Sequence, residues 1–377
     1  MDPELEEIKQ LIAEPEAPEP PVICAPQPVP RRSSFARILG KVLCVILETV
    51  LLLCIALYGV MFVLAKGPSP TARNLFVLSV RETSAVGFLA NLFFTEAEIA
   101  EIENATGDIN YEDTDTSLIE IPNTPDDGDE PKADAWGLID EDGDGIILEQ
   151  VRGEGYRGYM MVVLDPSRVI MGSKVDSFGK RGYTIAQMVE EFDAVAGINA
   201  GGFYDPEGRG NGSIPDTMVV YDGEVYYSSY GSAAGFAGID SNHILHVGKF
   251  TAQQVKDKDI QYGVGFGPVL ISNGQLAPIQ NSGVNPRTGI GQRSDGAFLL
   301  LVIEGRQVSS LGATYMDMAE IFLSYGAVNA CNLDGGSSSM MWFNGDYVND
   351  CASVVGIRPV PTSFLVLKKG GVENDGE

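Results

Sequence analysis

The most hydrophobic part of the chain runs from Val42 to Ala65, and Glu48 is the only charged side chain within these 24 residues. As an α-helix this run would be about 36 Å long, enough to cross a hydrocarbon core of about 30 Å. A helix inside a soluble domain is rarely so long and apolar on every face, and a cleaved signal peptide has a shorter apolar region closer to the N-terminus. The pattern therefore predicts one transmembrane helix, at residues 37–66.

Basic residues flank the apolar run 42–65 unevenly. Lys66 and Arg73 follow it, whereas four bases precede it, namely Arg31, Arg32, Arg37 and Lys41. Because cytoplasmic flanks carry the excess of Lys and Arg, the N-terminus is expected in the cytoplasm. Everything after about residue 66 is then expected outside the cell, attached to the cell membrane by a single pass.

Beyond residue 145 the pattern changes to short apolar runs separated by glycine. The spacing of apolar residues predicts helices at 183–192 and 316–325, and Asp222-Gly223 predicts a tight β-hairpin. Strands outnumber helices, so we predict an α+β fold with a mixed, largely antiparallel sheet and a few packed helices, preceded by one transmembrane helix. The predicted strands are 145–151, 159–164, 168–171, 195–199, 218–221, 224–227, 243–247, 267–272, 296–304 and 363–367.

The net charge of −27 is concentrated outside the strand-rich region. Residues 96–149 hold nineteen acids and one base, whereas residues 150–377 hold 24 acids and 16 bases. No basic footprint of a nucleic-acid binder is present. The predicted parts are a disordered acidic and proline-rich cytoplasmic tail (1–36), the transmembrane helix (37–66), a stalk and acidic linker (67–139), a folded domain (140–370) and a tail (371–377).

An acidic loop before the first strand begins like a calcium-binding EF-hand. Asp140, Asp142 and Asp144 fall at positions 1, 3 and 5 of such a loop, and Gly145 falls at position 6. Position 12 is Val151 instead of the bidentate glutamate, and no helix pattern precedes the loop. We interpret the loop as a turn that leads into a strand, and we predict neither a metal nor a cofactor. A divalent ion such as Ca²⁺ is the weaker alternative.

Two familiar kinds of catalytic site find no support. The chain has no G-x-S-x-G elbow and no Walker loop, and its two histidines, His243 and His246, lie in a strand-like run that places them on opposite faces. A histidine-driven serine hydrolase and a two-histidine metal site are therefore disfavoured.

Three polar clusters set among glycines are the candidates for chemistry. Asn199 ends a strand and offers both a donor and an acceptor, and the glycines after it expose backbone N–H groups. Arg287 enters a strand after a proline, where its guanidinium suits an anionic oxygen such as that of phosphate. Asp334 stands at a turn between apolar runs, a setting that favours proton transfer or binding. Each cluster also fits ordinary turn chemistry, but at one mouth of the sheet they would together suit a phosphorylated or acidic sugar.

Four motifs resemble the phosphodiester glycosidase family. GINAGGF (197–203), NPRTGIG (285–291), EGRQ (304–307) and NLDGGSSSM (332–340) occur in the order and approximate spacing of that family. The resemblance covers residues 145–370 and implies a hydrolase that removes a sugar from a sugar-1-phosphodiester. Bacterial members of the family are often described as exopolysaccharide-biosynthesis proteins.

Two positions depart from the family pattern. Asn285 stands where members often have His, and Ser337 stands where many have a third glycine. Carried over by position, the resemblance implies Asn199, Arg287 and Asp334 as catalytic residues. The predicted substrate-binding residues are Thr288, Gly201, Gly202, Phe203, Arg306, Gly335, Gly336, Ser337 and Ser338.

Each catalytic candidate has an expected role. Arg287 would hold the phosphate, and Asn199 would hold sugar hydroxyls or an acetamido group. Asp334 would act as a base on water or stabilise an oxocarbenium-like centre. The sequence does not identify a second catalytic carboxylate, for which the weak candidates are Glu304, Asp205 and Asp317.

The sequence thus predicts an extracellular, membrane-anchored hydrolase that cleaves a sugar-1-phosphodiester in cell-wall or exopolysaccharide glycans. Its expected partners are an anionic glycan and the membrane, and nucleic acid is not expected. The alternative is a non-catalytic module that binds an anionic cell-surface polysaccharide with the same pocket.

Overall fold

The computed structural model describes residues 34–83, 86–103, 109–122, 133–226, 235–279, 281–353 and 356–370. Of the predicted tails, residues 1–33 and 371–377 lie outside the described residues, whereas residues 34–36 belong to a helix. The chain divides into two compact units, residues 1–60 and residues 61–377, which we describe separately.

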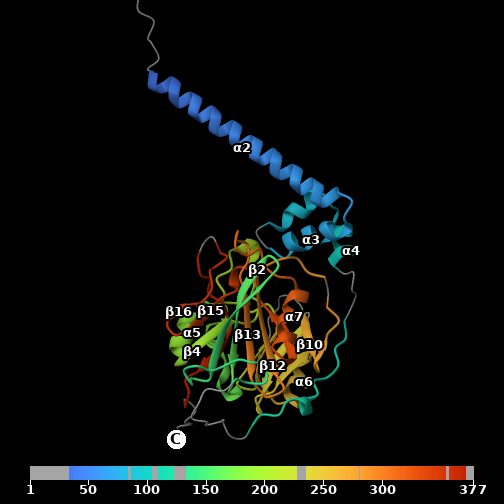
Figure 1. Cartoon of the computed structure of the whole chain (residues 1–377), viewed down its shortest axis with the longest axis vertical. Coiled ribbons are helices and arrows are strands. Elements are labelled where there is room, and N and C mark those ends of the chain that lie inside the picture. Colours follow the sequence, from blue (N-terminus) through green and yellow to red (C-terminus); the bar gives the residue numbers. More distant parts are fainter. Residues whose placement is uncertain are drawn as a thin grey trace, which may run out of the picture. The chain divides into compact units, whose positions relative to one another are not determined.

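A single helix, α2 (Ser34–Lys66), covers the predicted transmembrane segment and is the long blue helix of Figure 1. Its part Arg37–Lys66 is long and apolar enough to cross a membrane. The side chains of residues 37–60 are exposed, which for an apolar surface is expected in lipid and not in water. The structure thus contains the predicted candidate span.

The strands form three sheets, and every pairing between these strands is antiparallel. The α+β class is therefore confirmed, although the expected single mixed sheet is replaced by three. The seven-stranded sheet has the order β1 (Ile146–Gly153), β2 (Tyr156–Val163), β13 (Phe298–Ile303), β12 (Arg287–Arg293), β14 (Ala327–Leu333), β10 (Val269–Ser272) and β11 (Gln275–Leu276).

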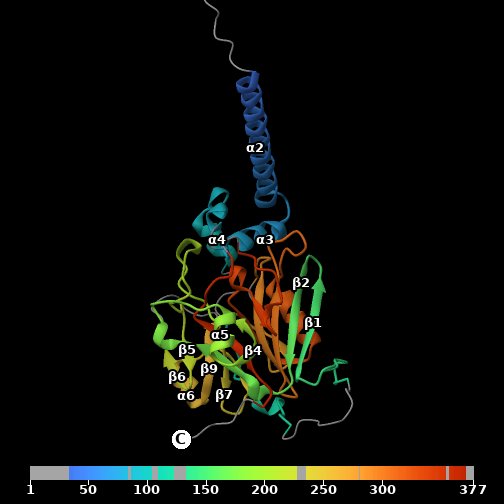
Figure 2. The same ribbon diagram turned by 90° about the vertical axis from the view of Figure 1, so that its left-hand side faces the viewer.

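The other two sheets have five strands each. One has the order β16 (Asp346–Tyr347), β15 (Met341–Phe343), β4 (Ala194–Asn199), β17 (Thr362–Leu367) and β3 (Val169–Ser173). The other, grouped with α6 (Ala252–Asp257) in Figure 2, has the order β6 (Glu224–Tyr226), β5 (Val219–Tyr221), β9 (Ile260–Phe266), β7 (Gly235–Asp240) and β8 (Leu245–Gly248). The predicted hairpin at Asp222-Gly223 joins β5 and β6.

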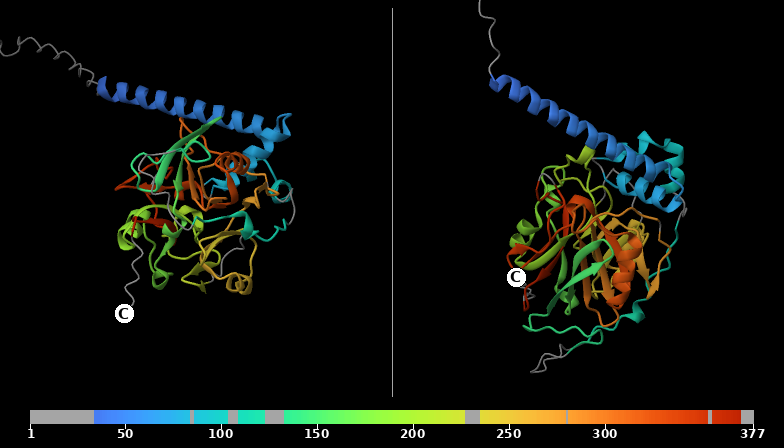
Figure 3. Two further views of the ribbon diagram at one scale, coloured as in Figure 1. Left: turned by 60° about the horizontal axis from the view of Figure 1, so that its bottom comes forward. Right: turned by 45° about the horizontal axis from the view of Figure 1, so that its top comes forward.

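Segments far apart in the sequence pair within these sheets. β2 pairs with β13, and β3 and β4 both pair with β17, so green and orange-to-red strands interleave in Figure 3. The strands from residue 146 onward therefore belong to the same fold as the C-terminal strands.

All three sheets contribute to one hydrophobic core. Ile290, Ile198 and Val264 come from different sheets and are completely buried in the same cluster. On the outer face of the large sheet, α7 (Tyr315–Ser324) packs Phe322 against β12. In the five-stranded sheet that contains β4, α5 (Ile185–Glu191) covers that strand. A Cβ at Gly289 would lie 2.9 Å from Phe322, so this glycine of the NPRTGIG motif is needed for close packing of the helix.

The stalk has its own small core. α3 (Pro70–Arg81), the 3₁₀-helix η1 (Gly87–Leu92) and α4 (Glu96–Glu103) pack together around Val77, Ala90 and Ile99. Shorter 3₁₀ turns elsewhere are η2 (Thr116–Leu118), η3 (Pro166–Arg168), η4 (Val175–Ser177), η5 (Pro206–Gly208) and η6 (Gly336–Ser338).

The expected extended linker needs correction for the described part of the acidic tract. The backbone N–H of Val247 donates to the Thr114 hydroxyl at 3.1 Å, and Ile119 is buried. Tyr111 packs against the main core, and Asp134 pairs with the buried Arg293 at 2.6 Å. Apolar side chains spaced among the acids thus hold the tract to the domain, because burial of their apolar surface is favourable. The acidic composition of the tract does not reveal these contacts.

Candidate active site

The three polar clusters meet at the ends of three strands. β12 and β14 are antiparallel, and Thr288 near the start of one pairs with Leu333 at the end of the other. The backbone N–H of Asp334 donates to the carbonyl of Ala200, just after β4, at 2.9 Å. The start of β12 and the ends of β4 and β14 therefore surround one site.

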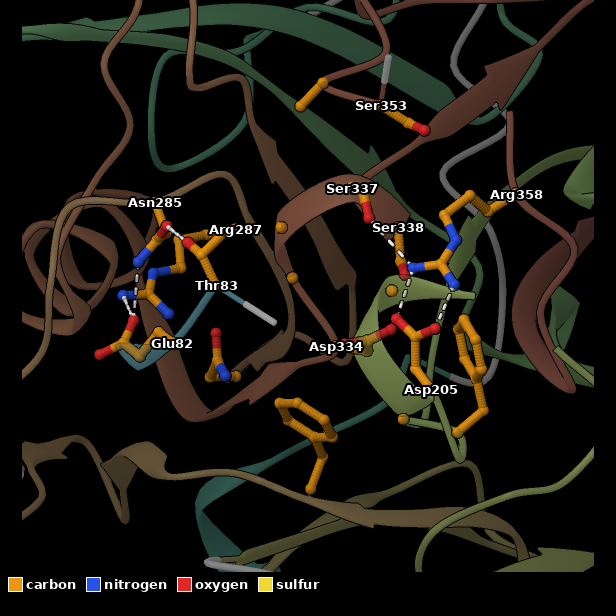
Figure 4. A pocket seen from close by; sticks show the side chains of 18 of the residues that line it. Glu82, Thr83, Asp205, Asn285, Arg287, Asp334, Ser337, Ser338, Ser353 and Arg358 are labelled. Atoms are coloured by element: carbon orange, nitrogen blue, oxygen red, sulfur yellow. Dashed lines mark hydrogen bonds and ion pairs between the residues drawn. The ribbon is translucent and has the colours of Figure 1, made fainter. Parts of the chain in front are cut away.

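A cavity of about 550 Å³ opens at this meeting point. Figure 4 shows two groups of side chains along it. Glu82, Thr83, Asn285 and Arg287 form one group, which together with Arg306 we call the cationic end. The labelled members of the other group are Asp205, Asp334, Ser337, Ser338 and Arg358. Together with Asp216, which also lines the cavity, we call them the carboxylate end.

Arg287 is fixed at the cationic end by several contacts and is only 4% exposed. Its Nε donates to the carbonyl of Ala313 at 3.0 Å, and its Nη2 donates to the carbonyl of Gly283 at 2.7 Å. Its guanidinium stacks on the ring of Tyr315, 4.2 Å from the ring centre. These contacts orient the fork before any ligand binds.

The carboxylate of Glu82, from the end of the stalk helix α3, occupies this cationic end. One of its oxygens accepts from Nη2 of Arg287 at 2.6 Å and from Nδ2 of Asn285 at 2.9 Å. The other accepts from the backbone N–H of Gly283 at 2.8 Å. A charged guanidinium, an amide and a backbone N–H thus converge on one anion, which is how proteins bind phosphate and carboxylate groups.

Arg306 adds a second guanidinium to the same end. Its Nη2 donates to the Thr83 hydroxyl at 2.8 Å and to Oδ1 of Asn285 at 3.1 Å. Burial and, after it, the charge of Arg287 lower the pKa of Arg306. Among the described residues Arg306 has no carboxylate within 4.0 Å, whereas Arg287 pairs directly with Glu82.

Asp334 is the central acid of the other end. It is partly exposed to the cavity, and burial raises its pKa to about 7. A hydrogen bond with Ser338 and the charge of Arg358 lower this pKa, whereas Asp216 and Asp205 raise it. A carboxyl that titrates near neutral pH can both donate and accept a proton in one catalytic cycle.

The structure places Asn199 behind the cavity, which corrects its expected role. Asn199 is completely buried, and its Nδ2 donates to the backbone carbonyl of Asp334 at 2.6 Å. Its Oδ1 accepts from the Thr288 hydroxyl at 2.9 Å and from the backbone N–H of Met340 at 3.1 Å. Every polar atom of the side chain is engaged, so it positions Asp334 and has no surface left for a sugar.

Of the other predicted substrate-binding residues, some line the cavity and two are buried behind it. Thr288 and Gly201 are buried, and the N–H of Gly201 donates to the Thr362 hydroxyl at 3.0 Å. Neither of the two lines the cavity, because both lie within the packed strand ends. The residues that do line it are Gly202, Phe203, Arg306, Gly335, Gly336, Ser337 and Ser338.

Of the three acids considered as a second carboxylate, only Asp205 lines the cavity. Glu304 is 2% exposed and pairs with Arg157, and Asp317 caps the N-terminus of α7. Asp205 accepts from both Nη atoms of Arg358, at 2.8 and 2.7 Å. It is therefore neutralised by an arginine that sequence reasoning did not single out.

The acidic loop forms the predicted turn. The Asp140 carboxylate accepts from the backbone N–H of Gly143 at 3.0 Å and of Gly145 at 2.9 Å. One oxygen each of Asp140, Asp142 and Asp144 lies within 4.8 Å of the others. These hydrogen bonds account for the turn, and calcium binding there stays the weaker, untested alternative.

Replacing Asp334 by Asn is expected to stabilise the protein at pH 8 but not at pH 4. The pKa of about 7 in the folded state exceeds the ordinary value of 3.8, so the folded state holds the proton more tightly than the unfolded state. Stability therefore falls as the pH rises between these two values. The difference between these two pKa values sets an upper limit of about 4 kcal/mol on the increase in the free energy of unfolding at pH 8. Urea unfolding at both pH values tests this, and an equal effect at both would contradict it.

Comparisons with known proteins identify the segment that carries the four motifs. A family model described as phosphodiester glycosidase matches residues 192–367. An uncharacterized SPbeta prophage-derived protein of Bacillus subtilis is 33% identical over 181 residues, which are 44% of this chain and 27% of that protein. The N-acetylglucosamine-1-phosphodiester alpha-N-acetylglucosaminidase of Bos taurus is 26% identical over 186 residues, 44% of this chain and 34% of that enzyme. The matches thus span only 27% and 34% of these curated relatives.

Among solved structures, the zebrafish N-acetylglucosamine-1-phosphodiester alpha-N-acetylglucosaminidase catalytic domain, auto-inhibited by its pro-peptide, aligns with a TM-score of 0.49. The identity is 17%, and the alignment covers 59% of this chain and 82% of that chain. All four motifs fall inside the segment matched by the family model. The resemblance seen in the sequence is thus confirmed, and residues 192–367 of this chain match the family model of the phosphodiester glycosidases.

Proposed function

We propose that the domain hydrolyses a sugar-1-phosphodiester between the glycosidic carbon and the phosphate oxygen. The family supports a hydrolase that acts on phosphodiester-linked glycans. The observation that carries the finer proposal is one cavity with an anion-binding cluster at one end and Asp334, whose pKa is about 7, at the other. A bond between a sugar and a phosphate presents an anion and a reacting carbon side by side, as this arrangement requires.

The substrate would lie along the cavity with its phosphate on Arg287 and Arg306. The sugar would then occupy the carboxylate end, where the paired Asp205 and Arg358 and the hydroxyl of Ser337 offer both donors and acceptors. Asp334 would exchange a proton with the bridging oxygen at the junction. The phosphate is itself a good leaving group, and Asp334 would supply the proton while the bond from the sugar carbon to the bridging oxygen breaks.

We place the domain outside the cell, attached by α2, with cell-wall or exopolysaccharide glycans as substrates. The support is one helix that is long and apolar enough to span a membrane, and the excess of bases before it. Protease protection of intact cells with a tag at either terminus would test the orientation.

The activity is best tested with the full chain in detergent micelles, because Glu82 and Thr83 of the stalk line the cavity. Methyl and para-nitrophenyl phosphodiesters of several sugar 1-phosphates would be incubated with and without a chelator. Release of free sugar by the wild-type protein, but not by Asp334→Asn, would support the proposal. Tight binding of the same compounds without release would favour the non-catalytic binding module.

Replacing Glu82 by Gln is expected to lower KM for the phosphodiester by about tenfold. The substrate phosphate and the Glu82 carboxylate compete for Arg287, and a charge-assisted hydrogen bond contributes about 1.5–3 kcal/mol. Steady-state kinetics would measure the effect, with the exposed Glu101→Gln on α4 as the control. An unchanged or higher KM would mean that Glu82 does not compete with the phosphate.

A further inference from the structure

Asp216 lines the cavity and has no cationic partner among the residues that the structure describes. Its backbone N–H donates to the carbonyl of Gly202 at 3.2 Å, and its side chain lines the cavity. A Cβ on Gly202 would lie 2.8 Å from one carboxylate oxygen and 2.9 Å from the other. The glycine therefore provides the room that the carboxylate occupies, and almost any other residue there would displace it.

The chemical state of this carboxylate is unusual among the acids of the site. Its Oδ1 is buried and has no hydrogen-bond partner among the described residues. Burial raises the pKa of Asp216, although hydrogen bonds from its own backbone and from Thr217 offset part of the rise. Asp205, by contrast, is held by two nitrogens of Arg358. A carboxylate with one buried oxygen that lacks a partner destabilises a fold, so its presence in a cavity points to use by a ligand.

Asp216 and Asp334 are anchored on the same short turn after β4. Asp334 donates its backbone N–H to Ala200, and Asp216 donates its own to Gly202, two residues further on. The charge of Asp216 contributes to the raised pKa of Asp334. Arg306 at the cationic end also interacts with the charge of Asp334, whereas no arginine contributes to the shift of Asp216. The backbones of Asp334 and Asp216 are thus held at neighbouring positions of one turn, Ala200 and Gly202.

We propose that Asp216 is the second carboxylate of the reaction and removes a proton from the attacking water. This inference rests on the proposed hydrolysis of a sugar-1-phosphodiester. The water oxygen forms a bond to the glycosidic carbon while the bond from that carbon to the phosphate oxygen breaks. The electron pair of the broken bond leaves with the phosphate oxygen, which takes the proton of Asp334. Asp216 keeps the water proton and later releases it to solvent, while Asp334 takes a proton back from solvent, so both acids return to their starting states. The products are the free sugar and a phosphate monoester.

The test compares Asp216→Asn and Asp216→Ala with the exposed Asp222→Asn on the β5–β6 turn, all in the full chain. Asp216→Asn is expected to lower kcat by about a hundredfold to ten-thousandfold with little change in KM. It should also remove the acidic limb of the pH–rate profile, because that limb reports ionisation of the base. Asp222→Asn should behave as wild type.

Azide gives a second readout that a merely structural role would not produce. Azide has no proton to lose, so it can attack the glycosidic carbon in the space vacated by Asp216→Ala and form a glycosyl azide. No such product is expected from Asp334→Asn, which retains Asp216. Mass spectrometry of the products would detect it, and thermal unfolding would show that each variant is folded.

The outcomes separate this inference from the proposed function. If the wild-type protein releases no sugar from any phosphodiester, the proposed function fails and this inference fails with it. If the wild type is active and Asp216→Asn retains kcat within about threefold, only the role of Asp216 is overturned. Loss of activity with an intact acidic limb and no glycosyl azide would also overturn it.

Discussion

Replacing Asp334 by Asn is expected to lower kcat by about a thousandfold while KM changes little. Asn keeps the size of the side chain and can still accept the hydrogen bond from Ser338, but it cannot give a proton to the leaving phosphate oxygen. Because burial raises the pKa of Asp334 to about 7, the wild-type rate should fall above neutral pH as the proton is lost. The variant should lack this alkaline limb.

Initial rates over the range pH 5 to pH 9 would measure both effects. Asp346→Asn is a suitable control, since Asp346 is exposed at the start of β16. The variant should remain folded, and at pH 8 it should be more stable than the wild type. A variant that keeps both its rate and the alkaline limb would show that another group donates the proton.

The three candidate clusters are far apart in the sequence, yet their proximity in space could be predicted. Asn199, Arg287 and Asp334 each stand where an apolar run meets glycine or proline, which marks the end of a strand. Strand ends can be inferred from local pattern, and antiparallel pairing brings the start of one strand to the end of its neighbour. The family motifs then identified which strand ends belong together, and the structure places all three within one site.

The role of Asn199 could not be predicted in the same way. An amide that donates and accepts suits a sugar hydroxyl as well as it suits a backbone carbonyl. Only the positions of Thr288, Met340 and Asp334 decide between the two, and they engage both Oδ1 and Nδ2 of the amide. A polar residue at a strand end can therefore be recognised from sequence as important without its ligand being known.

Glu82 and Asp216 carry no local signature at all. Glu82 belongs to a stalk helix some 200 positions before Arg287, and nothing in its immediate sequence indicates an anion-binding site. Asp216 follows a loop between two strands, where a carboxylate is ordinarily solvated. Its proposed role is inferred from its position in the cavity and from the room left by Gly202. Both are properties of the packed fold and not of the local sequence.

Replacing Arg287 by Ala is expected to lower kcat/KM by about a hundredfold, chiefly through KM. The guanidinium is pre-oriented by Ala313, Gly283 and Tyr315, so it would bind phosphate without further ordering. A hydrogen bond to a charged group is worth about 1.5–3 kcal/mol, which corresponds to one to two powers of ten in binding. Arg287→Lys should recover only part of the loss, because an ammonium cannot form the bidentate fork.

A structural collapse must be separated from a loss of phosphate binding, since Arg287 is buried and also pairs with Glu82. The double variant Arg287→Ala/Glu82→Gln leaves no unpaired carboxylate and should fold better than Arg287→Ala alone. Guanidinium ion added to the double variant should restore part of kcat/KM, whereas it should not affect the exposed control Arg152→Ala. If the double variant is stable, binds phosphodiester as tightly as wild type and gains nothing from guanidinium, then the phosphate does not lie on Arg287. The cationic end would then serve only to hold the stalk, and the substrate anion would have to be sought beside Arg358 instead.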